Sequence, residues 1–510
     1  MSFLLVCLNL IAPAIDADHV LRGGMVYDGT GQEPLKADVA IKGDRIVAIG
    51  PNLVVNDKAK ALDVTGLIIT PGFIDLHTHS DAAITQPGTR NNVNYVMQGV
   101  TTIVTGNCGM GPVRVGGLYQ QINKNGAGTN VAHLIPHNDV RRQVMGNVNR
   151  EPTAKELEQM QALVDQGMKE GAWGMSTGLY YTPGSYAKTN ELVELARIVA
   201  SHKGIYASHI RDEFGGLLGA IQEVITIGQE AKLPVHVSHM KAAGRGMWGK
   251  SSEALALIAQ ARNKGLKITA DQYPYTAGST SLEATVIPLR YREGSRKELL
   301  ARFDDPQVRA AMQELLKRDD DGKAIRIARY QPRPDWQGKD LAAIAVMEKK
   351  TPLEIAIEIE RNGGAQIVHF IMHEQDVRLI MKQDFVATAS DGGAMVVNDT
   401  VPHPRSYGCF PRKIGHYALE EKLLPLEQAI RSASGLPADI LQLQDRGYLR
   451  QGYFADIVVI DPTTFKDTAT YEKPHQYAAG LKYLFVNGQL TVVDGKYNGA
   501  LAGRPLRKGS

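Results

Sequence analysis

The sequence predicts an α/β protein in which eight parallel strands, each followed by a helix, close into a barrel. From about residue 71 to residue 434, short apolar runs alternate with amphipathic, helix-like segments, and the connections between them are short. This alternation is typical of a parallel sheet wrapped by helices, and eight such units form a TIM-like (β/α)8 barrel. The predicted strands end near His79, Thr105, Pro136, Thr177, His209, His239, Asp271 and Asp391.

The residue pattern at both ends of the chain differs from that of the middle. Residues 18–70 and 435–510 contain short strand-like runs broken by tight turns, and Asn487-Gly488 is a typical hairpin turn. We therefore expect the two ends to form one small β-sandwich domain together.

Within the barrel region, Thr153 and Glu156 have the spacing of a capping box and predict a helix that runs to about Glu170. The segment between Asp271 and Asp391 is too long for one crossover. Its charged, helix-like part, about residues 288–350, is predicted to be an insertion near the barrel mouth that covers it as a lid.

Composition indicates a globular protein and disfavours some classes of partner. The chain has 510 residues, with 43% hydrophobic and 22% charged residues, a net charge of +3 and 6% aromatic residues. Such a small charge and so few aromatics give no reason to expect nucleic acid as a partner. No internal segment is long and apolar enough to predict a transmembrane span.

Residues 2–14 are apolar, and small residues follow from Ala12 to Ala17, so that residues 1–17 have the pattern of a signal peptide. The positive charge that normally precedes such a segment is missing. We expect export, to the periplasm or the medium; the alternative is a buried N-terminal strand in a cytoplasmic protein.

Metal-binding residue types follow several of the predicted strands. His77 and His79 are two positions apart, so they share one face of an extended segment, and two imidazoles on one face can hold a metal ion. A barrel brings its strand ends to one rim, where enzymes of this fold carry out their chemistry. The sequence therefore predicts a metal site from His77, His79, Cys108, His209, His239 and Asp391.

This pattern resembles the amidohydrolase superfamily and, within it, the N-acyl-D-amino-acid deacylase (D-aminoacylase) family. The resemblance covers about residues 21–488. It is carried by Gly106-Asn107-Cys108-Gly109, Ser208-His209-Ile210-Arg211-Asp212-Glu213, Ser238-His239-Met240-Lys241, Ala389-Ser390-Asp391-Gly392 and His403-Pro404-Arg405-Ser406-Tyr407-Gly408.

The resemblance implies how the metal site is divided. Cys108, His209 and His239 would hold one Zn²⁺ tightly, while His77, His79 and Asp391 would form a second, weaker position. A thiolate with two imidazoles suits zinc. Many relatives bridge two metals with a lysine of the fourth strand, but the matching segment AWGMSTG contains none. Asp391 would be the catalytic acid/base that takes a proton from the metal-activated water and passes it to the departing amine.

The resemblance also implies a site for the substrate carboxylate, formed by Lys241, Tyr273, Ser279 and Arg405. Tyr275 and Ser281 have the same six-residue spacing, so the tyrosine–serine pair is open to a slip of two positions. The implied activity is hydrolysis of a small-molecule N-acyl-D-amino acid to a carboxylate and a free D-amino acid.

Two further residues near the predicted metal site have expected structural roles. Asp75 is expected to orient the segment that carries His77, and His236 is expected to point to the opposite strand face from His239. The alternatives are a cyclic-amide hydrolase of the hydantoinase or dihydropyrimidinase kind and a non-catalytic barrel scaffold. The sequence leaves the substrate side chain, the number of bound metals and the oligomeric state unpredicted.

Overall fold

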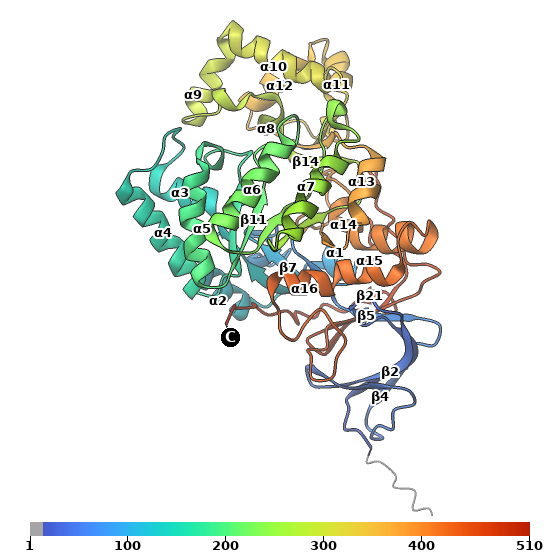
Figure 1. Ribbon diagram of the computed structural model, residues 1–510. Helices are drawn as coiled ribbons and strands as arrows, with labels where there is room; N and C mark the ends of the chain where they lie inside the picture. Colours follow the sequence, from blue (N-terminus) through green and yellow to red (C-terminus); the bar gives the residue numbers. More distant parts are fainter. Residues whose placement is uncertain (1–13, 510) are drawn as a thin grey trace, which may run out of the picture.

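The barrel predicted from the sequence is present in the computed structural model, which describes residues 14–509 (Figure 1). Its strands lie in a six-stranded sheet, β17-β13-β12-β11-β10-β9, and a three-stranded sheet, β6-β7-β8. β8 and β9 are two pieces of one strand separated by Leu134, so the barrel has eight strands in total. The bounds are β6 (Phe73–Asp75), β7 (Val100–Thr105), β8 (Asn130–His133), β9 (Ile135–Pro136), β10 (Gly174–Gly178), β11 (Ile205–His209), β12 (Val235–Val237), β13 (Ile268–Gln272) and β17 (Val386–Thr388).

The first and last strands of the barrel meet just beyond their C-terminal ends. The backbone N–H of Asp391 donates to the carbonyl of His77 at 2.8 Å, and the N–H of His79 donates to the carbonyl of Gly392 at 2.6 Å. These two bonds close the barrel at the rim where three of the predicted metal ligands lie.

Helices surround the barrel strands. The predicted capping box is confirmed, because Thr153 and Glu156 exchange side-chain to backbone bonds at the start of α4 (Ala154–Lys169). The apolar faces of the helices and strands pack into one large buried cluster. The other helices around the barrel include α2 (Val115–Asn125), α3 (His137–Met145), α5 (Thr189–Ser201), α6 (Leu217–Ala231), α7 (Ser251–Asn263), α13 (Glu374–Met381), α15 (Leu426–Ala433) and α16 (Gly435–Leu441).

Both ends of the chain contribute to one nine-stranded sheet, which lies at the opposite end of the molecule from the helices of residues 296–361, α9–α12 (Figure 1). The strands from the two ends join where β18 pairs antiparallel with β5. The turn at Asn487-Gly488 is present, with φ of 49° and 75°, between β19 and β20. The bounds are β1 (His19–Val26), β2 (Leu35–Lys42), β3 (Arg45–Gly50), β4 (Lys60–Asp63), β5 (Ile68–Pro71), β18 (Ile457–Ile460), β19 (Leu481–Val486), β20 (Gln489–Val493) and β21 (Lys496–Tyr497).

The inserted unit is larger than the predicted 288–350 segment, and it is not helical throughout. It contains a three-stranded sheet, β14-β16-β15, with a buried cluster of its own. The first strand was missed because its sequence, AGSTS, has no alternating apolar residues. The unit comprises β14 (Ala277–Ser281), α8 (Leu282–Val286), α9 (Arg296–Ala301), α10 (Pro306–Arg318), β15 (Ile325–Arg329), α11 (Leu341–Glu348), α12 (Pro352–Arg361) and β16 (Gln366–Phe370).

Two sequence-based expectations concern membranes. The predicted signal peptide, residues 1–17, lies outside the described residues except at its end. Among residues 14–509, no helix has the length and apolar character needed to cross a bilayer.

Candidate metal centre and active site

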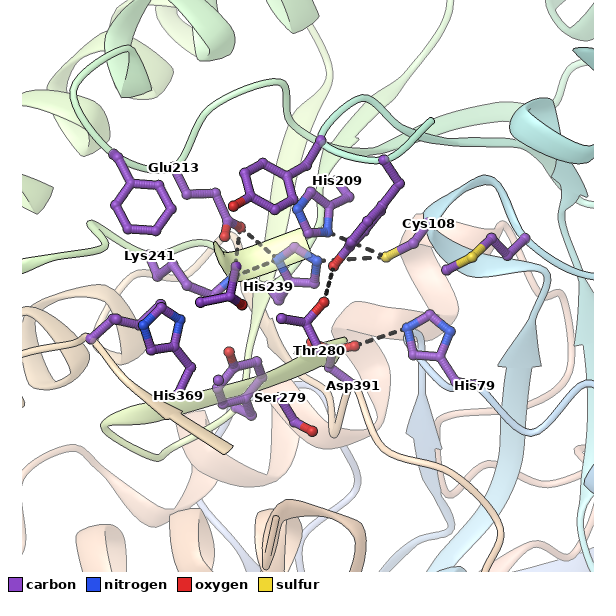
Figure 2. Close-up of a pocket in the computed structure, with 18 residues that line it drawn as sticks. His79, Cys108, His209, Glu213, His239, Lys241, Ser279, Thr280, His369 and Asp391 are labelled. Carbon is purple, nitrogen blue, oxygen red and sulfur yellow. Dashed lines mark hydrogen bonds and ion pairs between the residues drawn. The ribbon is translucent and has the colours of Figure 1, made fainter. Parts of the chain in front are cut away.

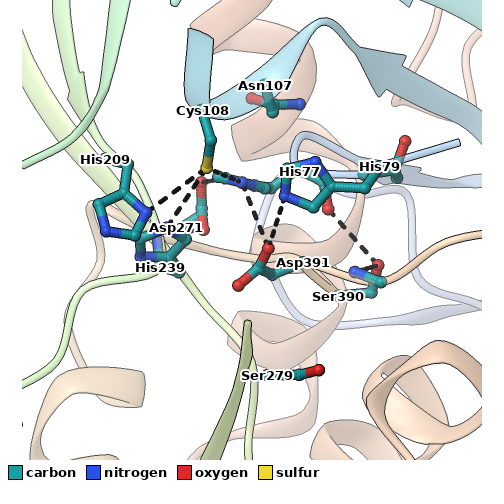
Figure 3. A network of polar contacts seen from close by, with 12 residues as sticks. His77, His79, Asn107, Cys108, His209, His239, Asp271, Ser279, Ser390 and Asp391 are labelled. Carbon is teal, nitrogen blue, oxygen red and sulfur yellow. Dashed lines mark hydrogen bonds and ion pairs between the residues drawn. The ribbon is translucent and has the colours of Figure 1, made fainter. Parts of the chain in front are cut away.

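Three side chains from different strand ends converge at the barrel mouth (Figure 3). Cys108 lies in the short turn after β7, His209 is the last residue of β11, and His239 lies two residues beyond β12. The Cys108 Sγ is 3.6 Å from His209 Nδ1 and 3.6 Å from His239 Nε2. Tetrahedral zinc with ordinary Zn–S and Zn–N bond lengths would place sulfur and nitrogen about 3.6 Å apart. The Cys108 Sγ therefore lies at a zinc-compatible distance from one nitrogen of each histidine.

His77, His79 and Asp391 form a second group of donors beside the first. His79 Nε2 is 3.0 Å and His77 Nε2 is 3.5 Å from Asp391 Oδ1. His77 Nε2 also lies 3.2 Å from the Cys108 Sγ, so the two groups adjoin. Three triads have donor atoms close enough to share an ion: His77–Cys108–His239, His77–His79–Asp391 and His209–Glu213–His239.

The backbone is unusual at three of these residues. Cys108, His239 and Asp391 have φ of 51°, 34° and 49°, in the left-handed region that few non-glycine residues adopt. Each lies two or three residues beyond the end of a barrel strand, where the chain leaves the barrel wall. Conformations of this kind are held at functional sites by the surrounding structure.

Burial favours the uncharged forms of Cys108, His77 and His209. It raises the pKa of the Cys108 thiol well above its usual value, lowers the pKa of His77 to about 4, and lowers that of His209 well below its usual range. The His209 Nε2 has no hydrogen-bond partner within the structure. A bound cation would favour the thiolate, as the chemistry of this donor set requires.

Two carboxylates that the sequence analysis did not assign lie behind the histidines. Glu213 Oε1 is 2.9 Å from His239 Nδ1 and 2.5 Å from the ammonium of Lys241. Lys241 Nζ is also 2.7 Å from His239 Nδ1. Only the tautomer of His239 with its proton on Nδ1 leaves Nε2 free for a metal. In that arrangement, His239 Nδ1–H and Lys241 both donate to Glu213. Glu213 lies four residues after His209, in the Ser208–Glu213 motif that carries part of the resemblance to the D-aminoacylase family.

Asp271, at the end of β13, is the second such carboxylate. Its Oδ2 is 3.4 Å from His77 Nδ1 and 2.8 Å from His236 Nε2, and its Oδ1 accepts the backbone N–H of His239. His236 is not among the converging donors, but the expectation that it points away from the site was wrong. β12 ends at Val237, so strand alternation does not extend from His236 to His239.

Asp75 has the orienting position that the sequence predicted. Its Oδ1 accepts the backbone N–H groups of His77 and Ser390 at 3.1 and 3.0 Å, which ties the ends of β6 and β17 together. Complete burial raises the pKa of this carboxyl to about 7, although those hydrogen bonds oppose the shift.

The predicted carboxylate-binding residues lie at the same pocket. Lys241, Tyr273 and Ser279 line it, as Figure 2 shows for Lys241 and Ser279. The Arg405 guanidinium lies 4.7 Å from the centre of the Tyr273 ring, and its Nη1 is 2.8 Å from Asp391 Oδ2. Burial alone would raise the pKa of Asp391, but Arg405 and the nearby imidazoles hold it well below its usual range.

The open choice between two tyrosine–serine pairs has a clear geometric answer. Tyr273 and Ser279 line the pocket, whereas Tyr275 and Ser281 do not. Tyr275 packs against His403 and Tyr471 instead. Tyr180 and Tyr181, which the sequence analysis did not single out, also line the pocket and pack against His209.

An eight-stranded barrel with two adjoining groups of histidine, cysteine and aspartate donors at its mouth defines the class of metal-dependent hydrolases. The chain belongs to the amidohydrolase family, whose model matches residues 60–496. The non-catalytic scaffold alternative therefore finds no support.

Known relatives share nearly the whole chain. It is 36% identical to a D-aminoacylase, over 96% of this chain and 98% of that protein. It is 34% identical to an N-acyl-D-glutamate deacylase (92% and 93% covered) and 33% identical to an N-acyl-D-aspartate deacylase (96% and 94%). All three are from Alcaligenes xylosoxydans xylosoxydans.

Two solved structures are similar throughout. A D-aminoacylase crystal structure matches with a TM-score of 0.83 at 35% identity, over 96% of this chain and all of that one. An N-acyl-D-glutamate deacylase from Bordetella bronchiseptica, complexed with zinc and a phosphonate inhibitor that mimics the tetrahedral intermediate, matches with a TM-score of 0.83 at 31% identity, with the same coverage.

Proposed function

We propose that this chain hydrolyses the amide bond of N-acyl-D-amino acids and releases a carboxylate and a free D-amino acid, with zinc as the metal. The observation that carries the proposal is that the Cys108 Sγ lies at a zinc-compatible distance from both His209 Nδ1 and His239 Nε2, beside the Asp391–Arg405 pair. The preference for D-amino acids is supported by the relatives, each of which is named for such a substrate.

Cys108, His209 and His239 would hold the tight zinc ion, and His77, His79 and Asp391 would hold a weaker second ion. Zinc bound there supplies a Lewis acid that polarises an amide carbonyl and lowers the pKa of water. Two metal positions are consistent with the structure of a D-aminoacylase that is 34% identical to this chain. That enzyme has a binuclear metal centre, in which one metal activates and the second attenuates.

Asp391 is the group that would move the proton. Its low pKa keeps the carboxylate ionised at neutral pH, so one oxygen can accept a proton while the other stays paired with Arg405 at 2.8 Å. The same carboxyl then donates that proton to the amine that leaves. The carboxylate also lies within 3.5 Å of the Nε2 atoms of His77 and His79.

Lys241, Tyr273, Ser279 and Arg405 would bind the α-carboxylate of the substrate. Both cations are nearly buried, and each is held by a carboxylate of the protein, Glu213 or Asp391. A buried guanidinium can pair with a second carboxylate through its remaining N–H groups, which gives the site a fixed geometry.

The competing function is hydrolysis of a cyclic amide. A D-hydantoinase structure matches with a TM-score of 0.59 at 14% identity, which shows a common fold and nothing more. Zinc-loaded enzyme should hydrolyse N-acetyl-D-methionine with a kcat/KM far above that for hydantoin or dihydrouracil, measured as released amine. If the cyclic amides were the better substrates, the proposed function would be wrong.

A further inference from the structure

The first strand of the inserted unit, β14, forms part of the pocket wall. Gly278, Ser279 and Thr280 of this strand line the pocket, and Figure 2 shows the last two. Within the unit, β14 pairs antiparallel with β16, and that pairing holds the strand only to its own unit. The position of β14 relative to the barrel rim therefore depends on the short connection from β13 and on side-chain contacts.

His403 links this strand to the rim segment that carries Arg405. Its Nε2 is 2.8 Å from the carbonyl oxygen of Ala277, and its Nδ1 is 2.9 Å from the backbone nitrogen of Arg405, the first residue of α14 (Arg405–Pro411). A carbonyl only accepts and a backbone N–H only donates, so the proton lies on Nε2, and Nδ1 accepts. Burial and the neighbouring guanidinium lower the pKa of His403 well below its usual range, which keeps the ring neutral and able to make both bonds.

We infer that His403 is a positioning residue for recognition of the substrate α-carboxylate, because it fixes Arg405 and β14 relative to each other. The inference rests on the proposed function and adds a residue that this function does not yet include. It is carried by the two hydrogen bonds of the ring, by the contacts of Arg405 and by the packing around the ring.

The side chain of Arg405 returns to the same strand. Its Nη2 is 3.3 Å from the carbonyl oxygen of Ser279, and its Nη1 is 2.8 Å from Asp391 Oδ2. The guanidinium carbon lies 4.7 Å from the centre of the Tyr273 ring. Arg405 is thus tied to β14 twice, through its backbone by His403 and through its side chain by Ser279. A shift of β14 would change the direction of the guanidinium as well as the pocket wall.

Three tyrosine rings surround His403 and hold the orientation of its ring. The ring centres of Tyr273, Tyr275 and Tyr471 lie 5.9, 5.1 and 5.2 Å from that of His403. Tyr471 belongs to the segment between β18 and β19, so the terminal β domain also contributes to this packing. Because His403 is only 2% exposed, water cannot readily replace either hydrogen bond if the ring nitrogens are removed.

Losing both bonds should affect carboxylate binding more than metal binding. Ala277 and Arg405 are buried, and a buried carbonyl and N–H without partners are costly, so β14 and the start of α14 would move to find others. A displacement of about 1 Å at a substrate-positioning group can cost on the order of 100-fold in rate. The proposed tight-zinc donors come from other strand ends, so the zinc content should stay the same.

The test compares N-acetyl-D-methionine with its carboxamide, N-acetyl-D-methioninamide, as substrates of the zinc-loaded enzyme. The two differ in the charge that Arg405 would receive, so the acid-to-amide ratio of kcat/KM, measured from released acetate, reports carboxylate recognition. His403→Phe keeps a ring of similar size and removes both hydrogen bonds. It should lower this ratio at least about tenfold, mainly through a higher KM for the acid. An unchanged ratio would overturn the inference.

His403→Asn separates the two bonds and serves as the test if His403→Phe does not fold. An asparagine oxygen can accept the backbone N–H two residues further on, as in an Asx turn, but this side chain is too short to reach Ala277 as well. The ratio should fall about threefold, to a value between those of the wild type and His403→Phe. A wild-type ratio in His403→Asn would mean that the bond to β14 is not needed, and would overturn the inference.

His475→Phe is the control for general loss of packing. His475 also bridges two segments, with Nδ1 2.8 Å from the Tyr407 hydroxyl and Nε2 3.0 Å from the Thr400 carbonyl, but it is not among the described residues that line the pocket. This variant should keep the wild-type ratio. A fall as large as that in His403→Phe would overturn the inference but leave the proposed function intact. Failure of the wild-type, zinc-loaded enzyme to hydrolyse N-acetyl-D-methionine would instead overturn the proposed function.

Discussion

Replacing Glu213 with glutamine should weaken zinc binding although Glu213 is not expected to touch the metal. Its Oε1 lies 2.9 Å from His239 Nδ1, and the contact is buried. The carboxylate accepts the Nδ1 proton, which fixes the tautomer that leaves Nε2 free and makes the imidazole a stronger donor. Glutamine keeps the size and one acceptor oxygen but removes the charge.

The expected loss follows from this contact. Removing an outer hydrogen-bonding partner of a metal-bound histidine costs 10- to 100-fold in metal affinity, or about 1.4–2.7 kcal/mol. The loss should fall toward the upper end, because the same oxygen also holds Lys241 at 2.5 Å. Without that anchor, the ammonium is free to donate a hydrogen bond to His239 Nδ1, which lies 2.7 Å away. Such a bond favours the tautomer with the proton on Nε2, which cannot bind a metal through Nε2.

The assay is a competition titration of metal-free protein with zinc and a chromophoric chelator. Glu223→Gln is the matched control, because Glu223 is a partly buried carboxylate that pairs with Arg211 at 2.9 Å and contacts none of the metal donors. The control should bind zinc within twofold of the wild type, at about the noise of the assay. Wild-type zinc affinity in Glu213→Gln would refute the reasoning.

Three other substitutions separate the roles of the site residues. Asp391→Asn should keep the tightly bound zinc but lower kcat by about 10²–10⁴-fold, because it removes the proton acceptor; near-normal turnover would exclude that role. Cys108→Ser should lower zinc affinity by more than the roughly 100-fold of an outer-partner loss, with buried Cys409→Ser as control; equal affinities in the two variants would exclude Cys108 as a ligand. Arg405→Met should raise KM for N-acyl-D-amino acids with little change in zinc content, and an unchanged KM would remove Arg405 from the substrate site.

The sequence predicted the metal site best where a metal-binding residue type lies at the C-terminal end of a predicted strand. His77, His209, His239 and Asp391 each follow an apolar run, and parallel strands that close into a barrel must bring such ends to one rim. The mutual approach of Cys108 and the histidines could be expected on that basis.

Other features depend on contacts that no local pattern encodes. Glu213 and Asp271 reach the site from loops and strand ends, and their partners are known only once the barrel has closed. His236 was misplaced because strand alternation was carried beyond the end of β12. The inserted unit was underestimated because small polar residues form its first strand. Export of the protein stays a prediction, as do the exact domain boundaries.

The central claim is that one zinc ion, held by Cys108, His209 and His239, makes this chain a deacylase of N-acyl-D-amino acids. Titrating zinc into metal-free protein while following hydrolysis of N-acetyl-D-methionine and its L isomer tests it directly. Activity toward the D isomer should rise with zinc and reach its maximum near one equivalent, with the L isomer far slower. Full activity in metal-free protein, or equal rates for the two isomers, would contradict the account.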